Sequence, residues 1–316
     1  MGMLKIEHLS HTYPNGTRAL DDVNLEIPAG MFGLLGPNGA GKSSLMRCLA
    51  TLQVPTAGSI HFGELDVLAQ PEALRATLGY LPQDFGVYPR VSAETLLDHL
   101  AVLKGISGRG ERRETVEALL QQVNLWEVRK KAVAGYSGGM RQRFGIAQAL
   151  IGNPRLIIVD EPTAGLDPEE RNRFNNLLSA IGEQVVVILS THIVDDVTDL
   201  CPRTAILVGG RIVEAGTPIA LIAALQGRIW QIGIDKSVLD DARARHAVIA
   251  TRLRAGQTVI RVLSEEPMRS PDDGFEPVEA GLEDVYFATL HRLRNQQAAR
   301  PAAAEAASAS SAEHAA

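Results

Sequence analysis

The sequence predicts an α/β fold built around a largely parallel β-sheet over residues 1–225. Three apolar runs carry this prediction, Met31–Gly36, Leu156–Val159 and Val185–Leu189, each of strand length. Continuous apolar runs of this length are typical of central parallel strands that are covered on both faces. Helical patterns alternate with them, as parallel β-α-β units require. These patterns cover Lys42–Leu52, Gly138–Leu150, Glu169–Ile181 and Ile193–Leu200.

The segments beside this sheet follow a different pattern. Leu4–Leu9 and Val23–Ile27 alternate apolar and polar residues, so we expect an antiparallel β subdomain there. Thr204–Val208 and Arg211–Glu214 flank a pair of glycines at 209–210, which is the pattern of a β-hairpin.

Two further regions interrupt the alternation of strands and helices. Residues 92–150 are expected to form a helical insertion, in which Ala93–Lys104 and Glu111–Val123 follow each other with no strand between them. A small α+β module is expected over residues 227–295, and a disordered tail over 298–316, where 11 of 19 residues are alanine. The expected elements of the module are strands Ile229–Ile234, Ala247–Leu253 and Thr258–Leu263 and a helix Leu282–Leu293.

Composition limits the classes of function that the chain can have. Its 316 residues are 45% apolar and 22% charged, which suits a globular protein and excludes global disorder. The net charge of −6 argues against a nucleic-acid-binding body, so no nucleic-acid partner is expected. The sequence has neither a signal-peptide pattern nor the ~18 apolar residues of a membrane span, so we expect a cytosolic protein. Cys48 and Cys201 lie in apolar stretches and are interpreted as buried free thiols.

The most specific motif is the segment Gly36–Ser43, with the sequence G-P-N-G-A-G-K-S between a strand and a helix. Glycines let backbone N–H groups turn toward an anion, and the helix N-terminus adds partial positive charge. We expect Lys42 to reach the β- and γ-phosphates of a nucleotide and the Ser43 hydroxyl to ligate Mg²⁺. A glycine turn that only caps a helix is the alternative. The expected phosphate-binding residues are Gly36, Pro37, Asn38, Gly39, Ala40, Gly41, Lys42, Ser43 and Ser44.

Two carboxylates follow directly on the strand Leu156–Val159. Ligands of open α/β sheets bind at the carboxyl ends of the strands, where Asp160 and Glu161 are expected to lie. We expect Asp160 to hold Mg²⁺ through water and Glu161 to be the general base for an attacking water. A structural strand end shows the same pattern, and the phosphate loop earlier in the chain favours the catalytic interpretation.

A second glycine-containing helix start lies between these motifs, at Tyr136-Ser137-Gly138-Gly139. Ser137 is a good helix N-cap, which is the structural alternative. Gly138 and Gly139 are more than a cap requires, and they suit a second anion site at a helix N-terminus.

In this order, the phosphate loop, the signature Ser137–Gly139 and the pair Asp160-Glu161 resemble the ATP-binding subunit of an ABC transporter over residues 3–225. The resemblance implies a P-loop NTPase core with an antiparallel β subdomain and a helical insertion. It also implies ATP and Mg²⁺ as cofactors and ATP hydrolysis as the activity. In that family Ser137, Gly138 and Gly139 would bind ATP held by a partner subunit, so that a homodimer or heterodimer sandwiches two ATP molecules head to tail.

Four further residues match motifs of the family. Tyr13 corresponds to the aromatic residue that stacks on adenine, with an ordinary hairpin aromatic as the alternative. Gln83 matches the glutamine that approaches Mg²⁺ and relays contact with the membrane subunit, and Asp167 matches the loop at the dimer interface. His192 matches the histidine that contacts the γ-phosphate and orients the water. Met140 departs from the family, which often has glutamine there.

The kind of ABC protein is indicated by weaker resemblances. The segments Gln83–Pro89, Glu94–Gly105 and Gly281–Phe287 resemble exporter-type subunits of bacterial multidrug, antibiotic and sodium export systems. We therefore expect an ATPase that powers export through a separate integral membrane permease, bound peripherally at the cytoplasmic side of the membrane. An importer ATPase and a soluble ABC ATPase acting on ribosomes or DNA stay open as alternatives. The sequence does not identify the transported molecule.

Overall fold

The structure, a computed structural model, describes residues 2–83, 85–86, 88–182, 185–264 and 274–296. Contacts within the chain divide it into two units, Met1–Ala215 and Gly216–Ala316. The tail predicted over 298–316 lies outside the described residues. In the described ranges, no helix combines the length and hydropathy that crossing a bilayer needs.

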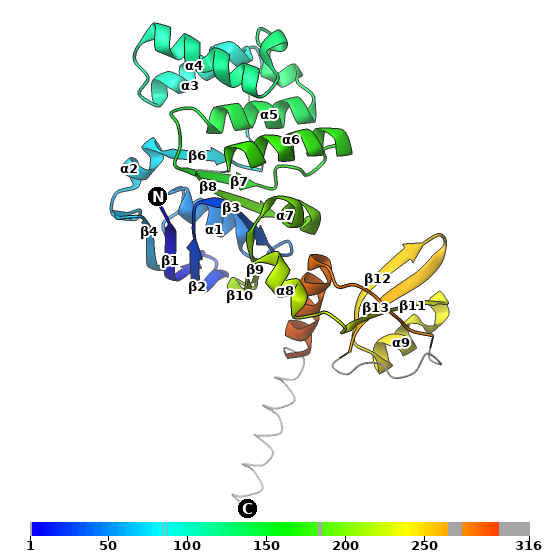
Figure 1. The fold of residues 1–316 in the computed structure, drawn as a ribbon. Helices are drawn as coiled ribbons and strands as arrows, with labels where there is room; N and C mark the ends of the chain where they lie inside the picture. Colours follow the sequence, from blue (N-terminus) through cyan, green and yellow to red (C-terminus); the bar gives the residue numbers. More distant parts are fainter. Residues whose placement is uncertain (1, 84, 87, 183–184, 265–273, 297–316) are drawn as a thin grey trace, which may run out of the picture. The chain divides into compact units, whose positions relative to one another are not determined.

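A six-stranded sheet with the order β10-β9-β3-β8-β7-β6 forms the centre of the first unit (Figure 1). Four neighbouring pairs run parallel: β9 with β3, β3 with β8, β8 with β7, and β7 with β6. The largely parallel sheet and its three apolar strands are therefore confirmed. The strand bounds are β3 Gly30–Leu35, β6 Leu78–Leu81, β7 Leu156–Asp160, β8 Val186–Thr191, β9 Arg203–Val208 and β10 Arg211–Gly216.

Helices cover both faces of this sheet. Helix α1 (Lys42–Leu49) contacts β7 and β8, and a buried core joins it to Phe32 and Leu34 on one face. Helix α7 (Val194–Leu200) contacts β3 and β8. It packs against Gly33, which lies on β3 between Phe32 and Leu34. Helices α5 (Gly138–Ala149) and α6 (Pro168–Ile181) lie on the side of the sheet away from β1 and β2 (Figure 1).

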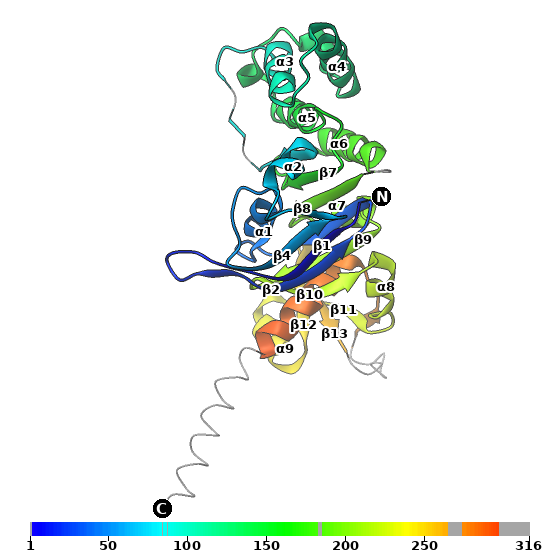
Figure 2. The same ribbon diagram turned by 90° about the vertical axis from the view of Figure 1, so that its left-hand side faces the viewer.

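The N-terminal strands form a separate antiparallel sheet with the order β2-β1-β4-β5, as predicted (Figure 2). Alternate residues of β1, among them Leu4 and Ile6, are buried and share one core with α1. The strand bounds are β1 Leu4–Thr12, β2 Arg18–Ile27, β4 Ala57–Phe62 and β5 Leu65–Asp66.

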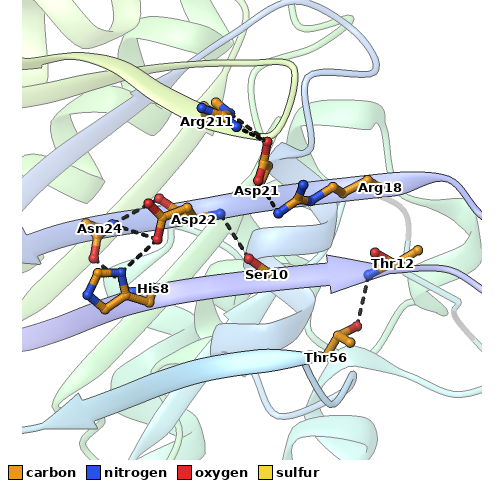
Figure 3. A network of polar contacts seen from close by, with 9 residues as sticks. All are labelled: His8, Ser10, Thr12, Arg18, Asp21, Asp22, Asn24, Thr56 and Arg211. Carbon is orange, nitrogen blue, oxygen red and sulfur yellow. Dashed lines mark hydrogen bonds and ion pairs between the residues drawn. The ribbon is translucent and has the colours of Figure 1, made fainter.

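A polar network ties this antiparallel sheet to the turn between β9 and β10 (Figure 3). Asp21 on β2 accepts a 2.6 Å hydrogen bond from Arg211 Nε and pairs with Arg18. The Asp21 backbone N–H donates to the Gly210 carbonyl at 2.9 Å, and the Gly210 N–H donates to the Ala40 carbonyl at 2.9 Å. The turn therefore connects the antiparallel sheet to the glycine-rich loop.

The predicted helical insertion is present. Helices α3 (Ala93–Leu103) and α4 (Arg109–Gln122) pack on each other and on α5, and no strand separates them. Ser92 caps α3 by accepting a hydrogen bond from the Thr95 N–H. The short helix α2 (Pro71–Ala76) and two 3₁₀ turns, Trp126–Val128 and Val133–Gly135, complete the helical elements described in this unit.

The second unit is an antiparallel sheet with helices. Its strand order is β12-β13-β11-β14, and the predicted helix spans residues 282–296. The three predicted strands are confirmed. The element bounds are α8 Pro218–Ala223, β11 Ile229–Ile234, α9 Leu239–Arg245, β12 Val248–Arg254, β13 Gln257–Leu263 and β14 Glu276–Pro277, with a 3₁₀ turn at Lys236–Val238.

Both cysteines are free and buried, as predicted. Burial raises the pKa of the Cys48 thiol to about 11, and burial together with the charge of Asp196 raises that of Cys201 to about 12. Because only a thiolate is a good nucleophile, both side chains behave as inert core residues near neutral pH.

Candidate active site

A cleft of about 530 Å³ lies where β3, β7 and β8 end and the antiparallel sheet meets α1. It gathers residues from five separate stretches of the chain, including most of the predicted site. The residues that line it are Tyr13, Thr17, Arg18, Ala19, Pro37, Asn38, Gly39, Ala40, Gly41, Lys42, Ser43, Ser44, Gln83, Glu161 and His192.

The glycines of the loop between β3 and α1 are required by its conformation. Gly39 and Gly41 have φ angles of +79° and +108°, in the left-handed region that favours glycine. A Cβ atom on Gly41 would lie 2.4 Å from the Ala19 carbonyl oxygen, and one on Gly36 would lie 2.4 Å from the Leu207 carbonyl oxygen. Neighbouring backbone therefore fits closely around this loop and fixes its shape.

Lys42 points into the loop that precedes it. Its ammonium donates a 2.7 Å hydrogen bond to the Gly36 carbonyl and lies 3.3 Å from Glu161 Oε1. The side chains of Lys42 and Glu161 are only 6% and 7% exposed, so their charges interact in a poorly solvated site. This arrangement places a positive charge beside the catalytic carboxylate expected from the sequence.

The Glu161 side chain lies between Lys42 and His192, and its backbone has an unusual conformation. Its φ is +50°, and its N–H donates a 2.8 Å hydrogen bond to the Ser190 carbonyl at the end of β8. Its Oε2 lies 2.6 Å from Nδ1 of His192, which follows β8. A non-glycine residue at positive φ persists only where its surroundings hold it, and such residues concentrate at functional sites.

Asp160 supplies the second carboxylate, at the last position of β7. Burial raises the pKa of Asp160, against the opposing effects of the Ser190 and Ser43 hydroxyls. Its Oδ1 is buried and has no hydrogen-bond partner among the described residues. An unsatisfied buried carboxylate oxygen near a serine hydroxyl fits Mg²⁺, which takes few protein oxygens and completes its shell with water and phosphate.

This donor set differs from a metal cage made by the protein alone. The part of the chain that the structure describes contains no group of three or more His, Cys, Asp and Glu side chains able to hold a metal. Asp160, Ser43 and the exposed cleft residue Gln83 would therefore hold Mg²⁺ only together with a bound phosphate.

Tyr13 lies at the rim of the cleft. Its hydroxyl is 2.9 Å from Ser44 Oγ and donates to Gln53 Oε1 at 3.3 Å, while the His11 ring packs edge-on against its ring at 4.8 Å. These contacts hold the Tyr13 ring beside the first turn of α1. The aromatic contact to a nucleotide base stays a prediction for this residue.

The signature residues lie outside the cleft. Ser137 caps α5 by accepting a 3.2 Å hydrogen bond from the Met140 N–H, and both Ser137 and Gly138 are exposed. Gly139 is buried, and a Cβ atom on it would lie 2.4 Å from Glu170 Oε2. None of the three lines the described cleft, so a single chain does not bring the two predicted anion sites together.

Asp167 is likewise exposed and away from the cleft. It caps α6 by accepting a 2.9 Å hydrogen bond from the Glu170 N–H. The structure thus gathers the phosphate loop, Glu161 and His192, and leaves the signature and Asp167 free to meet another molecule.

Sequence reasoning missed two kinds of site residue. Ala19 shapes the loop through its carbonyl oxygen, and backbone atoms leave no side-chain signal. Asp196 is a buried carboxylate that contacts Thr163, two residues after Glu161, but the pair Asp195-Asp196 in a short helix is typical of a solvated surface. Both residues are placed by tertiary contacts, which no local sequence pattern predicts.

The strand β3, the glycine-rich loop with Lys42 that follows it, and the carboxylates at the end of β7 define a P-loop nucleotide-binding ATPase. A family model described as ABC transporter matches residues 20–164. The chain is 30% identical over 314 residues to the uncharacterized ABC transporter ATP-binding protein YxlF of Bacillus subtilis (strain 168), covering 92% of this chain and 100% of that protein. This chain belongs to the family of ABC transporter ATP-binding proteins, and it is an ATP-binding ATPase subunit of that family.

The names of two further relatives refer to different activities, drug resistance in one and methionine import in the other. The daunorubicin/doxorubicin resistance ATP-binding protein DrrA of Streptomyces peucetius is 35% identical, covering 73% of this chain and 69% of DrrA. The methionine import ATP-binding protein MetN 2 of Yersinia pestis is 39% identical, covering 70% of each chain. The family is therefore shown, while these names leave the direction of transport open.

A solved structure agrees with the fold. The ATP-binding cassette MJ0796, in a dimeric post-hydrolysis state bound to ADP and Pi, superposes with a TM-score of 0.63 at 26% identity. The match covers 68% of this chain and 98% of that chain. The matched part of this chain therefore has the same fold as that protein, which binds ADP and Pi as a dimer.

Proposed function

We propose that this chain powers export through a separate integral membrane permease, bound peripherally at the cytoplasmic side of the membrane. One observation supports ATP hydrolysis as the energy source. Glu161 is buried in the phosphate cleft, 2.6 Å from His192. Support for export comes from the likeness to DrrA, named for drug resistance, and from the exporter-like segment Gly281–Phe287. MetN, named for import, supports the second candidate, an importer subunit.

The site supports the following division of tasks in hydrolysis. The Lys42 ammonium neutralises charge on the β- and γ-phosphates, and Glu161 accepts the proton of the attacking water as its oxygen approaches phosphorus. His192, hydrogen-bonded to Glu161, orients that water. When bound by Ser43, Asp160 and Gln83, Mg²⁺ would supply electrostatic stabilisation of the phosphate oxygens.

Dimerisation is supported by the position of the signature residues, which lie outside the cleft of the single chain. Ser137 and Gly138 are exposed at the start of α5, where N–H groups and the helix dipole favour a phosphate group. In a head-to-tail pair, these residues of one chain would cover the ATP bound to the other chain. Asp167 would then lie at the interface.

An apolar groove in the first unit supports docking of a permease. The groove, about 580 Å³, lies between the end of α3 and the strand β6. Leu52 and Leu103 border it with 62% and 70% of their surface exposed, so they extend the apolar surface of the groove. Tyr80 on β6 also lines the groove, and the chain runs from there directly to Gln83 in the cleft. A partner helix in the groove would therefore act on the nucleotide site through three residues of backbone.

Affinity capture of the full chain tests this proposal. The Glu161→Gln variant, with Mg-ATP, is purified from detergent-solubilised cells and its partners are identified by mass spectrometry. We expect a stoichiometric polytopic membrane protein. Leu103→Glu in the same background should lose this partner, whereas Leu253→Glu, equally exposed on β12 of the second unit, should keep it. Ribosomal proteins or DNA in place of a membrane protein would contradict the transport function.

The direction of transport needs a second measurement. Inside-out vesicles that contain the captured permease together with the wild-type chain expose this chain to added ATP. Export from the cell corresponds to ATP-dependent accumulation inside these vesicles, and import corresponds to ATP-dependent loss. Loss of a preloaded substrate would overturn the export proposal in favour of the importer.

A further inference from the structure

A fully buried carboxylate joins three elements of the first unit. Asp196, in the first turn of α7, has no exposed surface. Its Oδ2 accepts a 2.6 Å hydrogen bond from Thr163 Oγ1. Its Oδ1 accepts hydrogen bonds from Arg171 Nε at 2.7 Å and from Asn175 Nδ2 at 3.2 Å. The charge is therefore compensated and both carboxylate oxygens are satisfied.

The donors to Asp196 come from the segment that carries the catalytic base. Thr163 lies two residues after Glu161, in the loop between β7 and α6. Arg171 lies in the first turns of α6, and its N–H donates to the carbonyl of the cap residue Asp167 at 2.9 Å. Asp196 thus holds the loop 161–167 at two points: within the loop through Thr163, and beyond its end through Arg171 on α6.

Helix α7 provides a rigid base for this contact. Its buried residue Val197 packs on β3, where a Cβ atom on Gly33 would lie 2.5 Å from Val197 Cγ1. The helix begins two residues after His192. The same short segment therefore fixes the backbone beside His192 and the loop that carries Glu161.

We propose that Asp196 is a positioning residue that fixes the loop 161–167 relative to His192, and so aligns Glu161 with the attacking water. A buried ion pair is a weak source of stability compared with apolar packing, which favours a geometric purpose for this one. Through Arg171 and Asp167, the same carboxylate links each cleft to the interface of the proposed dimer. This last link and the alignment of Glu161 with the attacking water both rest on the proposed function.

Steady-state ATP hydrolysis by the full chain tests the proposal with two variants. Asp196→Asn should lower kcat by about 10- to 100-fold, because a misplacement of about 1 Å has effects of this size. KM and the Kd of a fluorescent ATP analogue should stay within about threefold, since the phosphate loop is untouched. Thr163→Val is nearly isosteric and leaves Arg171 and Asn175 on Asp196, so it tests the proposal even if Asp196→Asn fails to fold.

Two controls separate positioning from simple destabilisation. Asp195→Asn changes the same charge on an exposed position of α7 and should keep the wild-type rate. Adding Thr163→Val to Asp196→Asn should lower kcat no further, because both substitutions break one network. An unchanged kcat in Thr163→Val, or a loss of kcat matched by a rise in KM, would overturn the proposal. Absence of an ATP-dependent dimer would contradict the proposed dimer, while the comparison of kcat and KM still decides the function of Asp196.

Discussion

Glu161 shows how much of the chemistry depends on the surroundings of one residue. Its carboxylate lies 3.3 Å from the Lys42 ammonium and 2.6 Å from the His192 ring, and its backbone has a φ of +50°. Three different strand ends, those of β3, β7 and β8, bring these groups together. The sequence motif identifies the residues, but only the parallel sheet makes them neighbours.

Replacing the catalytic carboxylate by an amide is predicted to stop turnover without preventing binding. Glu161→Gln keeps the size of the side chain and removes the proton acceptor, so kcat should fall about 10²- to 10⁴-fold. The Kd for ATP should stay near the wild-type value. Phosphate release and equilibrium binding measure the two quantities, and a turnover close to wild type would exclude Glu161 as the base.

Asp160 is predicted to lower the stability of the free protein. Burial raises its pKa in the folded chain, so at neutral pH the fold holds an ionised carboxylate that the unfolded chain ionises more easily. This cost is present above the folded pKa and vanishes below the unfolded pKa, near the ordinary aspartate value of 3.8. Asp160→Asn should therefore unfold at a higher temperature at pH 7, with a gain that disappears as the pH falls toward that value.

The same variant should lose Mg²⁺-dependent ATP hydrolysis, since Asp160 is the carboxylate that fits the cation. Thermal unfolding from pH 3.5 to 7.5 in the absence of nucleotide measures the stability effect. Asp199→Asn, exposed on α7, is the matched charge control and should show no such gain. A lower midpoint for Asp160→Asn at pH 7 would contradict this account of the site.

At the scale of elements, the packing of α7 on the central sheet depends on one missing side chain. Gly33→Ala would bring a Cβ atom within 2.5 Å of Val197 Cγ1 and should destabilise the fold by about 1–3 kcal/mol through overpacking. Val197→Ala should cost about 2 kcal/mol through a cavity. The double variant should cost less than the sum, because each substitution relieves the other.

Urea unfolding of the four proteins measures this coupling. Gly110→Ala in α4 is the control, since nothing lies within 4 Å of its Cβ position and alanine favours helix. That variant should be neutral or slightly more stable. Strictly additive costs for Gly33→Ala and Val197→Ala would show that the two residues do not touch in the way described.

Elements with a strong local signal were predictable from the sequence. The apolar strands β3, β7 and β8 and the helix α6, which begins at a proline after the cap Asp167, follow from periodicity and end signals. Strand β6 was missed because it has four residues and Gly79, whose Cβ would lie 2.3 Å from the Ala149 carbonyl oxygen. Tertiary packing alone makes that segment a strand.

The same distinction holds for the site. The phosphate loop, Asp160 and Glu161 have short motifs whose chemistry can be recognised in a single sequence. Thr163, Arg171 and Asp196 are polar residues of ordinary appearance, and their meeting depends on how α6 and α7 pack. Residues that act directly on a ligand can therefore be predicted from sequence patterns. Residues that position them are harder to predict.

At the scale of the whole molecule, the central claim is that one chain holds only part of an ATP site. The cleft contains the phosphate loop, Glu161 and His192, whereas Ser137 and Gly138 are exposed elsewhere on the first unit. A second chain would supply them. ATP should therefore drive association, and hydrolysis should reverse it.

Sedimentation velocity of the full-length Glu161→Gln variant tests this claim most directly. We predict a monomer without nucleotide and a dimer with Mg-ATP. Adding Gly138→Asp, on an exposed glycine with no neighbour closer than 4.0 Å, should prevent the dimer by placing a carboxylate against the γ-phosphate. If the Glu161→Gln single variant binds ATP and yet sediments as a monomer at saturating Mg-ATP, the account is contradicted.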